Sequence, residues 1–224
     1  MAAILPASGT GSRTGASTAK QFWMIEGRPL LYYTLRTMES VAWLHDVIVP
    51  VSQDMMADMR VWLQTWGFVK TRLVVGGDTR HRSIANGLKA LRPTTTLVLV
   101  HDMVRPFVLP SDLEAVVEAA AEYGAAGCTL PLVSTVVKPS ADGFLDHVLT
   151  RSEYLASQTP QAFQRSILEA AYASCSAEDF DHGTEVLQLA QRYAGCSAKL
   201  VDVRPNVWKV TYKHDLYAAE AMIK

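Results

Sequence analysis

A stretch rich in Gly, Ser and Thr, with two basic residues, follows the first apolar run: ILPASGTGSRTGASTAKQF, residues 4–22. Glycines let backbone N–H groups approach phosphate oxygens closely, and Arg13 and Lys20 can neutralise the phosphate charge. A dinucleotide fingerprint would need a third glycine where Thr14 stands, and a Walker A loop would need Gly-Lys-Ser/Thr, which is absent. We therefore predict a phosphate-binding loop of another kind. The alternative is a plain strand-to-helix loop with surface charges.

A second stretch with chemical potential is GGDTRHRSIANG, residues 76–87. Its two leading glycines expose the backbone to a ligand. Asp78, Arg80 and Ser83 can hydrogen-bond a sugar or a base. On its own the stretch is equally typical of a turn that caps a helix with Asp or Thr.

The third stretch is HDMVRPF, residues 101–107, which follows an apolar run read as a buried central strand. A carboxylate at the end of such a strand is a common ligand of a hard cation, so Asp102 is predicted to bind Mg²⁺. Arg105 lies close behind it in the sequence, whereas His101 is predicted to be structural. Three later residues carry little information singly: Arg151, Thr159 and Lys209.

The sequence lacks the motifs of covalent catalysis. No GxSxG occurs, and no His or Cys residues have the spacing of metal ligands. The three loops share phosphate and divalent-cation chemistry without an obvious nucleophilic side chain. This combination favours direct phosphoryl-group transfer, in which catalysis rests on positioning and charge stabilisation.

Strand-length apolar runs alternate with helical patterns, and this alternation must position the loops. The runs read as strands are residues 2–7, 46–51, 72–77, 96–102, 126–132 and 198–203. Continuous apolar runs indicate strands covered on both faces, as in parallel sheets. The pattern predicts a doubly wound, mostly parallel α/β sheet of the Rossmann-like kind, whose ligands bind beyond the carboxyl ends of the strands. A helix is predicted over residues 110–124, with Ser111 as its N-cap and Gly124 as its stop.

Residues 133–160 interrupt the alternation. Two β-branched runs flank a Ser-Ala-Asp-Gly turn there, which predicts a β-hairpin projecting from the sheet. The exposed strand edges of such a hairpin are often covered by a second copy of the chain. We therefore expect residues 1–224 to form one domain with an arm at about 133–160 that makes a homodimer.

Composition narrows the classes of function. The chain has 224 residues, a formal net charge of -1 and no block of like charges, so a nucleic-acid-binding surface is not expected. No apolar run reaches about 18 residues, so no membrane span is expected. Three widely spaced cysteines and the lack of a signal-peptide pattern favour a cytoplasmic protein.

Several short motifs occur in a fixed order along the chain: Pro6-Ala7-x-Gly9-x-Gly11-x-Arg13, Lys20-Gln21, Gly76-Gly77-x-x-Arg80-x-x-Ser83, His101-Asp102-x-x-Arg105-Pro106, Thr159-Pro160-Gln161 and Lys209-Val210-Thr211. Together they resemble the IspD-type cytidylyltransferases, which transfer CMP from CTP to a sugar-alcohol phosphate. Stretches such as PLVSTVVKPSADG and DFDHGTE look most like the cytidylyltransferase domain of the animal isoprenoid synthase domain-containing proteins. The resemblance implies transfer of CMP to D-ribitol 5-phosphate, which gives pyrophosphate and CDP-ribitol for glycan synthesis.

The resemblance also implies roles for individual residues. The catalytic residues would be Arg13, Lys20 and Lys209. The triphosphate would be held by the loop amides of Ala7, Ser8, Gly9, Thr10, Gly11 and Ser12. Cytosine and ribose would be read by Gly77, Asp78 and Ser83. The acceptor would be bound by Arg105, Thr135, Arg151 and Thr159 together with Lys209, with Arg151 supplied by the partner subunit. Mg²⁺ would be held by Asp102 and Asn206.

Two positions depart from the family pattern. Asn206 stands where the family usually has an acidic residue, and its amide oxygen can bind Mg²⁺ but brings no charge. Ser8 stands where the animal proteins more often have Gly or Ala, and it is small enough to leave the loop path open. The alternatives are a 2-C-methyl-D-erythritol 4-phosphate cytidylyltransferase and a catalytically weak nucleotide-binding homologue. A sugar-1-phosphate nucleotidyltransferase for another base is a further alternative, against which residues 76–83 argue.

Overall fold

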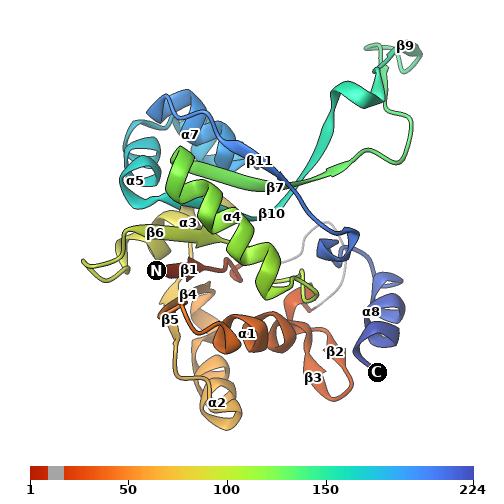
Figure 1. Cartoon of the computed structure of the whole chain (residues 1–224). Coiled ribbons are helices and arrows are strands. Elements are labelled where there is room, and N and C mark those ends of the chain that lie inside the picture. Colours follow the sequence, from red (N-terminus) through yellow and green to blue (C-terminus); the bar gives the residue numbers. More distant parts are fainter. Residues whose placement is uncertain (10–17) are drawn as a thin grey trace.

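A seven-stranded sheet forms the centre of the protein, in a computed structural model that describes residues 1–9 and 18–224 (Figure 1). Its strand order is β11-β7-β10-β6-β1-β4-β5. The strands are β1 (Ala2–Ile4), β4 (Asp46–Val51), β5 (Thr71–Val75), β6 (Leu97–Val100), β7 (Ala125–Pro131), β10 (Leu155–Gln164) and β11 (Lys199–Asp202). β10 runs antiparallel to both of its neighbours, and the other pairings are parallel. The prediction of a mostly parallel sheet is confirmed.

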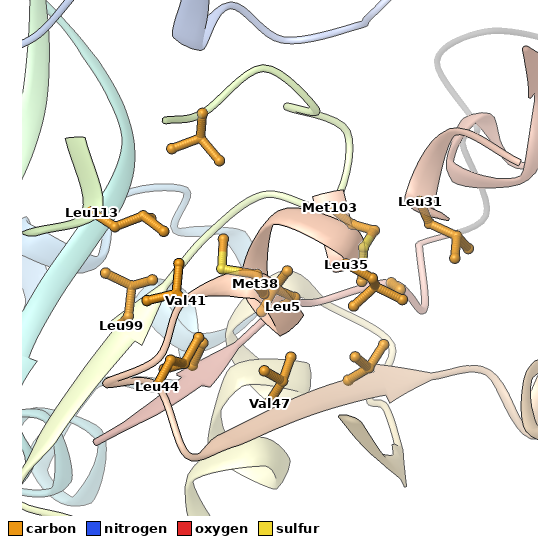
Figure 2. Packing of buried hydrophobic residues seen from close by; sticks show 14 of the residues in the cluster. Leu5, Leu31, Leu35, Met38, Val41, Leu44, Val47, Leu99, Met103 and Leu113 are labelled. Atoms are coloured by element: carbon orange, nitrogen blue, oxygen red, sulfur yellow. The ribbon is translucent and has the colours of Figure 1, made fainter. Parts of the chain in front are cut away.

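Helices cover both faces of this sheet (Figure 1). They are α1 (Leu30–Ser40), α2 (Met56–Trp66), α3 (Arg80–Lys89), α4 (Pro110–Tyr123), α5 (Arg165–Ser174), α6 (Ala177–His182), α7 (Val186–Ala194) and α8 (Asp215–Ile223). One core packs α1, α2 and α4 on the sheet, and Figure 2 shows Leu35 and Met38 of α1 and Val47 of β4 among its side chains. The other core packs α3, α5 and α7 on the opposite face.

Side chains of the central strand β1 alternate between the two cores. Ala3 and the following Leu5 belong to the core with α1, whereas Ala2 and Ile4 belong to the core with α3. Successive residues of a strand point to opposite faces of its sheet, so a strand buried on both faces is apolar throughout. This explains why the strand appears in the sequence as a continuous apolar run.

Strand β10 was missed by the sequence prediction, which assigned residues 133–160 to the arm. The hairpin exists, as β8 (Val137–Pro139) and β9 (Leu145–Val148), but residues 155–164 pair between β6 and β7. A proline normally argues against a central strand because it cannot donate to the ladder. Here the register shifts between Ser157 and Gln161, around Pro160, and the strand continues. The assignment of residues 1–224 to one domain stays a prediction.

The start of α4 also differs from the prediction. The N-cap is Leu109, with Pro110 at the first helical position, and Asp112 accepts a hydrogen bond from Leu109 N at 3.1 Å. Proline is preferred at that position because its missing N–H needs no partner there. Ser111 is therefore inside the helix. The predicted stop is confirmed, since Gly124 ends the helix with φ 92°.

A third, smaller apolar cluster joins distant parts of the chain. It packs Trp23 and Ile25, at the short hairpin of β2 (Met24–Ile25) and β3 (Arg28–Pro29), against Val104 and Val210. Ala219 of α8 completes the same cluster. The segments that carry Lys20 and Lys209 are thereby brought to the same end of the sheet. None of the helices in the described ranges is long and apolar enough to cross a membrane.

Candidate active site

A cavity of about 350 Å³ lies beyond the carboxyl ends of β1, β5 and β6, where an open α/β sheet binds its ligands. The three loops predicted from the sequence contribute to its walls, and so does the segment around Lys209. The predicted residues that line it are Ala7, Ser8, Gly9, Lys20, Gly77, Asp78, Arg80, Ser83, Asp102 and Lys209. Thr10, Gly11, Ser12 and Arg13 lie outside the described residues.

Asp102 is the electrostatic centre of this cavity. Its Oδ1 accepts a hydrogen bond from Arg80 Nη2 at 3.2 Å. Its Oδ2 accepts from Arg105 Nε at 3.2 Å and from Lys209 Nζ at 2.8 Å. Burial raises the pKa of the Asp102 carboxyl, but the charges of Arg80, Lys209 and Arg105 outweigh burial and hold that pKa well below its usual range. One ionised carboxylate therefore organises three cations, and the cluster keeps a net positive charge suited to phosphate.

Arg105 is buried beneath the cavity and does not line it. Besides Asp102, its guanidinium donates to Val207 O at 2.7 Å and to the side-chain oxygen of Gln158. Arg105 thus ties the loop after β6 to strand β10 and to the segment that precedes Lys209. The sequence predicted that Arg105 binds the acceptor; in this structure its Nε and Nη1 groups are engaged by the protein.

Thr159 and His101 lie behind Asp102 in one hydrogen-bonded chain. The carbonyl of Arg105 can only accept, so His101 Nε2 carries a proton and donates to it at 3.1 Å. Burial lowers the pKa of His101 to about 4, so its ring is neutral, and Nδ1 accepts from Thr159 Oγ1 at 3.2 Å. Thr159 Oγ1 in turn accepts from Asp102 N at 3.0 Å. His101 is therefore structural, as predicted, and Thr159 fixes the backbone of Asp102.

Gln21 ties the segment after the first loop to residues 7 and 9 at the start of that loop. It is buried, and its side-chain amide donates to Ala7 O at 2.8 Å and to Gly9 O at 2.9 Å. An amide nitrogen has two hydrogens, so both donors are used on the loop. Gln21 also lines the cavity. The sequence prediction gave it no role, and its place next to Lys20 in the motif was the only available signal.

The turn of residues 76–83 is held by its own hydroxyl groups. Ser83 Oγ accepts a hydrogen bond from Gly77 N at 3.1 Å and lies 2.9 Å from Thr79 O. Thr79 caps α3 by accepting from Arg82 N at 3.3 Å. A Cβ added to Gly77 would lie 2.4 Å from the Cβ of Arg82, so the turn requires glycine there. The carbonyl oxygen of Gly77 lies 3.1 Å from Ser83 Oγ and 3.3 Å from Ser8 Oγ, and its two lone pairs leave it able to accept from a ligand as well.

Three of the predicted residues lie away from this cavity. Thr135 and Arg151 are exposed at the base of the arm, where Arg151 Nη1 donates to Val133 O at 2.6 Å. Asn206 Nδ2 donates to Phe107 O at 2.5 Å, and Asn206 Oδ1 is buried without a hydrogen-bond partner. Neither the arm residues nor Asn206 lines the cavity.

Two carboxylates line the cavity, those of Asp78 and Asp102, and Asp102 is the one predicted to bind magnesium. Within residues 1–9 and 18–224, no group of three or more His, Cys, Asp or Glu side chains is arranged to hold a metal. Mg²⁺ in nucleotide sites is usually bound by one or two carboxylates, with substrate phosphates and water completing the octahedron. The residues present therefore fit a metal that arrives with a nucleotide, with Asp102 as the protein ligand. Asn206, the second predicted magnesium ligand, does not line the cavity, whereas Asp102 does.

Comparisons with known proteins place the site in context. The family model described as 2-C-methyl-D-erythritol 4-phosphate cytidylyltransferase matches residues 1–224. The chain is 52% identical to a D-ribitol-5-phosphate cytidylyltransferase of Rattus norvegicus, with all of this chain and 52% of that protein covered. It thus spans about half the length of the curated animal relatives it matches.

Bacterial relatives match over nearly their whole length. The chain is 36% identical to the 2-C-methyl-D-erythritol 4-phosphate cytidylyltransferase of Pelotomaculum thermopropionicum, covering 100% of this chain and 94% of that protein. Among solved structures, the 4-diphosphocytidyl-2C-methyl-D-erythritol synthase of Anaerococcus prevotii superposes with a TM-score of 0.85 at 28% identity. That match covers 99% of this chain and 97% of the other.

Proposed function

The chain belongs to the 2-C-methyl-D-erythritol 4-phosphate cytidylyltransferase family, and from this premise we propose that it transfers CMP from CTP to D-ribitol 5-phosphate. Family membership makes it a CTP-dependent nucleotidyltransferase. The acceptor is proposed from the animal relatives, which are 46–52% identical to this chain and are named for ribitol phosphate. The product would be CDP-ribitol, a donor for glycan synthesis.

The observation that carries the proposal is the cation cluster around Asp102, in a cavity that also contains Lys20 and the first loop. A triphosphate and a sugar phosphate together bring several negative charges into the site. Arg80, Lys209 and Lys20 supply positive charge from three segments. Such preorganised charge is what in-line phosphoryl transfer requires, because the protein itself does little covalent chemistry.

The backbone of Gly77 supports the choice of cytosine over uracil. Its N–H is donated to Ser83, whereas its carbonyl oxygen has two lone pairs and can accept from a base beside the nearby serine hydroxyls. A carbonyl accepts a hydrogen bond from an exocyclic amine, which cytosine has, and repels the carbonyl that uracil carries at the same ring position. The turn is therefore suited to CTP.

The reaction proposed is an in-line displacement. A phosphate oxygen of the acceptor attacks the α-phosphorus of CTP, the bond from that phosphorus to the β-phosphate oxygen breaks, and pyrophosphate leaves with the electron pair. Lys20 and Lys209 stabilise the charge that develops on the phosphate oxygens, while Asp102 and Arg105 hold Lys209 in place. Mg²⁺, bound by Asp102 and the triphosphate, would neutralise phosphate charge and keep the reacting groups in line.

A panel of acceptors tests the function. Purified chain is incubated with CTP, Mg²⁺ and either D-ribitol 5-phosphate, 2-C-methyl-D-erythritol 4-phosphate or another pentitol phosphate, and pyrophosphate release is followed. We expect the largest kcat/KM with D-ribitol 5-phosphate. A preference for methylerythritol phosphate would overturn the acceptor, and would agree with the bacterial relatives. No release with any acceptor, beside measurable CTP binding, would indicate a nucleotide-binding homologue without activity.

The arm is proposed to pair with a second copy of the chain. Phe144 and Leu145 on the hairpin are 76% and 64% exposed, and Val137 and Val148 on the two strands are also exposed. Apolar side chains gathered on a projecting hairpin are typical of an interface. Arg151 and Thr135 lie at the base of this arm, outside the cavity of their own chain, so a partner's cavity is their proposed place of action.

Charged substitutions on the arm test this pairing. The double variant Phe144→Glu with Leu145→Glu is expected to shift the chain from dimer to monomer at micromolar concentration, because burying two carboxylates in an interface is costly. Analytical ultracentrifugation measures the state. The control is Val61→Glu, an exposed position on α2, which should leave the sedimentation unchanged. A wild-type chain that sediments as a monomer at every concentration would contradict the dimer.

The cytoplasm is the proposed location. Cys128, Cys175 and Cys196 are free thiols, which supports a reducing compartment. The proposed partners are CTP and the sugar-alcohol phosphate, and the small net charge gives no support to a nucleic-acid partner.

A further inference from the structure

Ser8 lies where two parts of the nucleotide site meet. Its hydroxyl oxygen is 2.6 Å from Ser83 Oγ and 3.3 Å from the carbonyl oxygen of Gly77. We propose that the Ser8 side chain is a positioning residue that joins the triphosphate loop to the base-reading turn and keeps the two in register. This inference rests on the proposed use of CTP, and it assigns the hydroxyl a task separate from that of the loop amides.

The Ser8 side chain packs directly against the backbone of the turn at Gly76. A Cβ built on Gly76 would lie 2.4 Å from Ser8 Cβ and 2.6 Å from Ser8 Oγ, closer than real Cβ atoms come. The next neighbour of that Cβ would be Ser83 Oγ, at 3.3 Å. Ser8 therefore fills the space between the first loop and the turn, and a movement of either segment has to move the other.

The hydrogen bonds at this contact share a limited number of protons. Each serine hydroxyl has one proton and can accept two hydrogen bonds. If Ser8 donates to Ser83, the Ser83 proton goes to Thr79 O or Gly77 O, which lie 2.9 and 3.1 Å away. If Ser83 donates to Ser8 instead, the Ser8 proton goes to Gly77 O. Ser8 thus sets how many donors compete for the carbonyl oxygen that is proposed to read cytosine.

Removal of the Ser8 hydroxyl is expected to weaken binding of the nucleoside part of CTP and to leave binding of the triphosphate part unchanged. In Ser8→Ala the backbone N–H of residue 8 and the cations of the cavity remain, so binding of inorganic tripolyphosphate should stay within about twofold of wild type. The variant loses the hydrogen bond between Ser8 and Ser83, so the turn is held less firmly for the base. The Kd for CTP should therefore rise about fivefold, which corresponds to the net free energy of one hydrogen bond. The Kd for UTP should rise less, so the preference for CTP narrows. Isothermal titration calorimetry measures all three.

The control is Ser40→Ala, which removes an exposed hydroxyl that donates to Thr37 O on α1, and all three Kd values should stay at wild-type levels. An unchanged CTP Kd in Ser8→Ala would overturn the inference, as would an equal loss of CTP and tripolyphosphate affinity. This test measures binding and does not depend on catalysis. If the chain transferred CMP to no acceptor, the proposed function would be contradicted, but the CTP and tripolyphosphate Kd values would still decide whether Ser8 has the proposed role. Failure of the wild-type chain to bind CTP would overturn both.

A second pair of variants tests the contact without using a ligand. Gly76→Ala is expected to lower the Tm, because its Cβ collides with Ser8. Adding Ser8→Gly removes both Ser8 atoms from that collision, leaving Ser83 Oγ as the tightest neighbour, so the double variant should recover more than half of the lost Tm. A double variant that is no more stable than Gly76→Ala alone would show that Ser8 does not hold the turn.

Discussion

Replacement of Asp102 by asparagine is expected to lower the free energy of unfolding by about 3 kcal/mol, the scale for removing one partner from a buried ion pair. The reason is the set of three cations that share this carboxylate. Arg105 is the most buried of them, with a side chain 8% exposed, and it would be left as an uncompensated buried charge. Arg80 and Lys209 would in addition repel each other. Denaturant unfolding at pH 7 measures the change.

The matched control for this variant is Asp181→Asn. Asp181 also pairs with an arginine, since it accepts from Arg82 Nε at 2.6 Å, but both side chains are substantially exposed. Exposed ion pairs contribute little, so the loss should stay below about 1 kcal/mol. Equal losses in the two variants would contradict the view of Asp102 as the buried organiser of the site. Transfer activity should fall in Asp102→Asn and remain in Asp181→Asn.

Replacement of Lys20 by alanine is expected to lower kcat by roughly 10²–10³, the usual effect of one lost preorganised donor at a developing charge. Lys20 lines the cavity beside the first loop, which Gln21 closes. The measurement is pyrophosphate release at saturating CTP and acceptor. A rise in KM with kcat unchanged would show that Lys20 binds ground state and transition state equally. Lys199→Ala, on edge strand β11, serves as the control and should keep wild-type kcat.

The loops of the site could be predicted from the sequence because local rules govern them. A glycine-rich stretch after a buried apolar run indicates a loop at the carboxyl end of a parallel strand, and this held for the first loop's Gly9 and for Gly77. Asp102 could be predicted in the same way. Alternation of strands and helices was enough to indicate the doubly wound sheet.

The rest of the site depends on contacts between residues far apart in the chain. Arg80 was expected to bind a sugar or base, yet it pairs with Asp102, and no local pattern encodes a pairing between loops of different strands. Arg105 was placed by the sequence close behind Asp102, and the family resemblance assigned it to the acceptor. Its burial follows from Gln158 and Val207, which only the fold brings close.

The position of β10 has a consequence for the order in which the sheet can be assembled. β6 and β7 precede β10 in the chain, yet β10 lies between them and pairs with both. Until residue 164 has left the ribosome, the facing edges of β6 and β7 have no partner within the chain, and unpaired edges attract other strands. The centre of the sheet is therefore completed late, and the site with it, since Thr159 of β10 binds the backbone of Asp102. A nascent chain that stalls between β7 and β10 would carry an open slot in its central sheet.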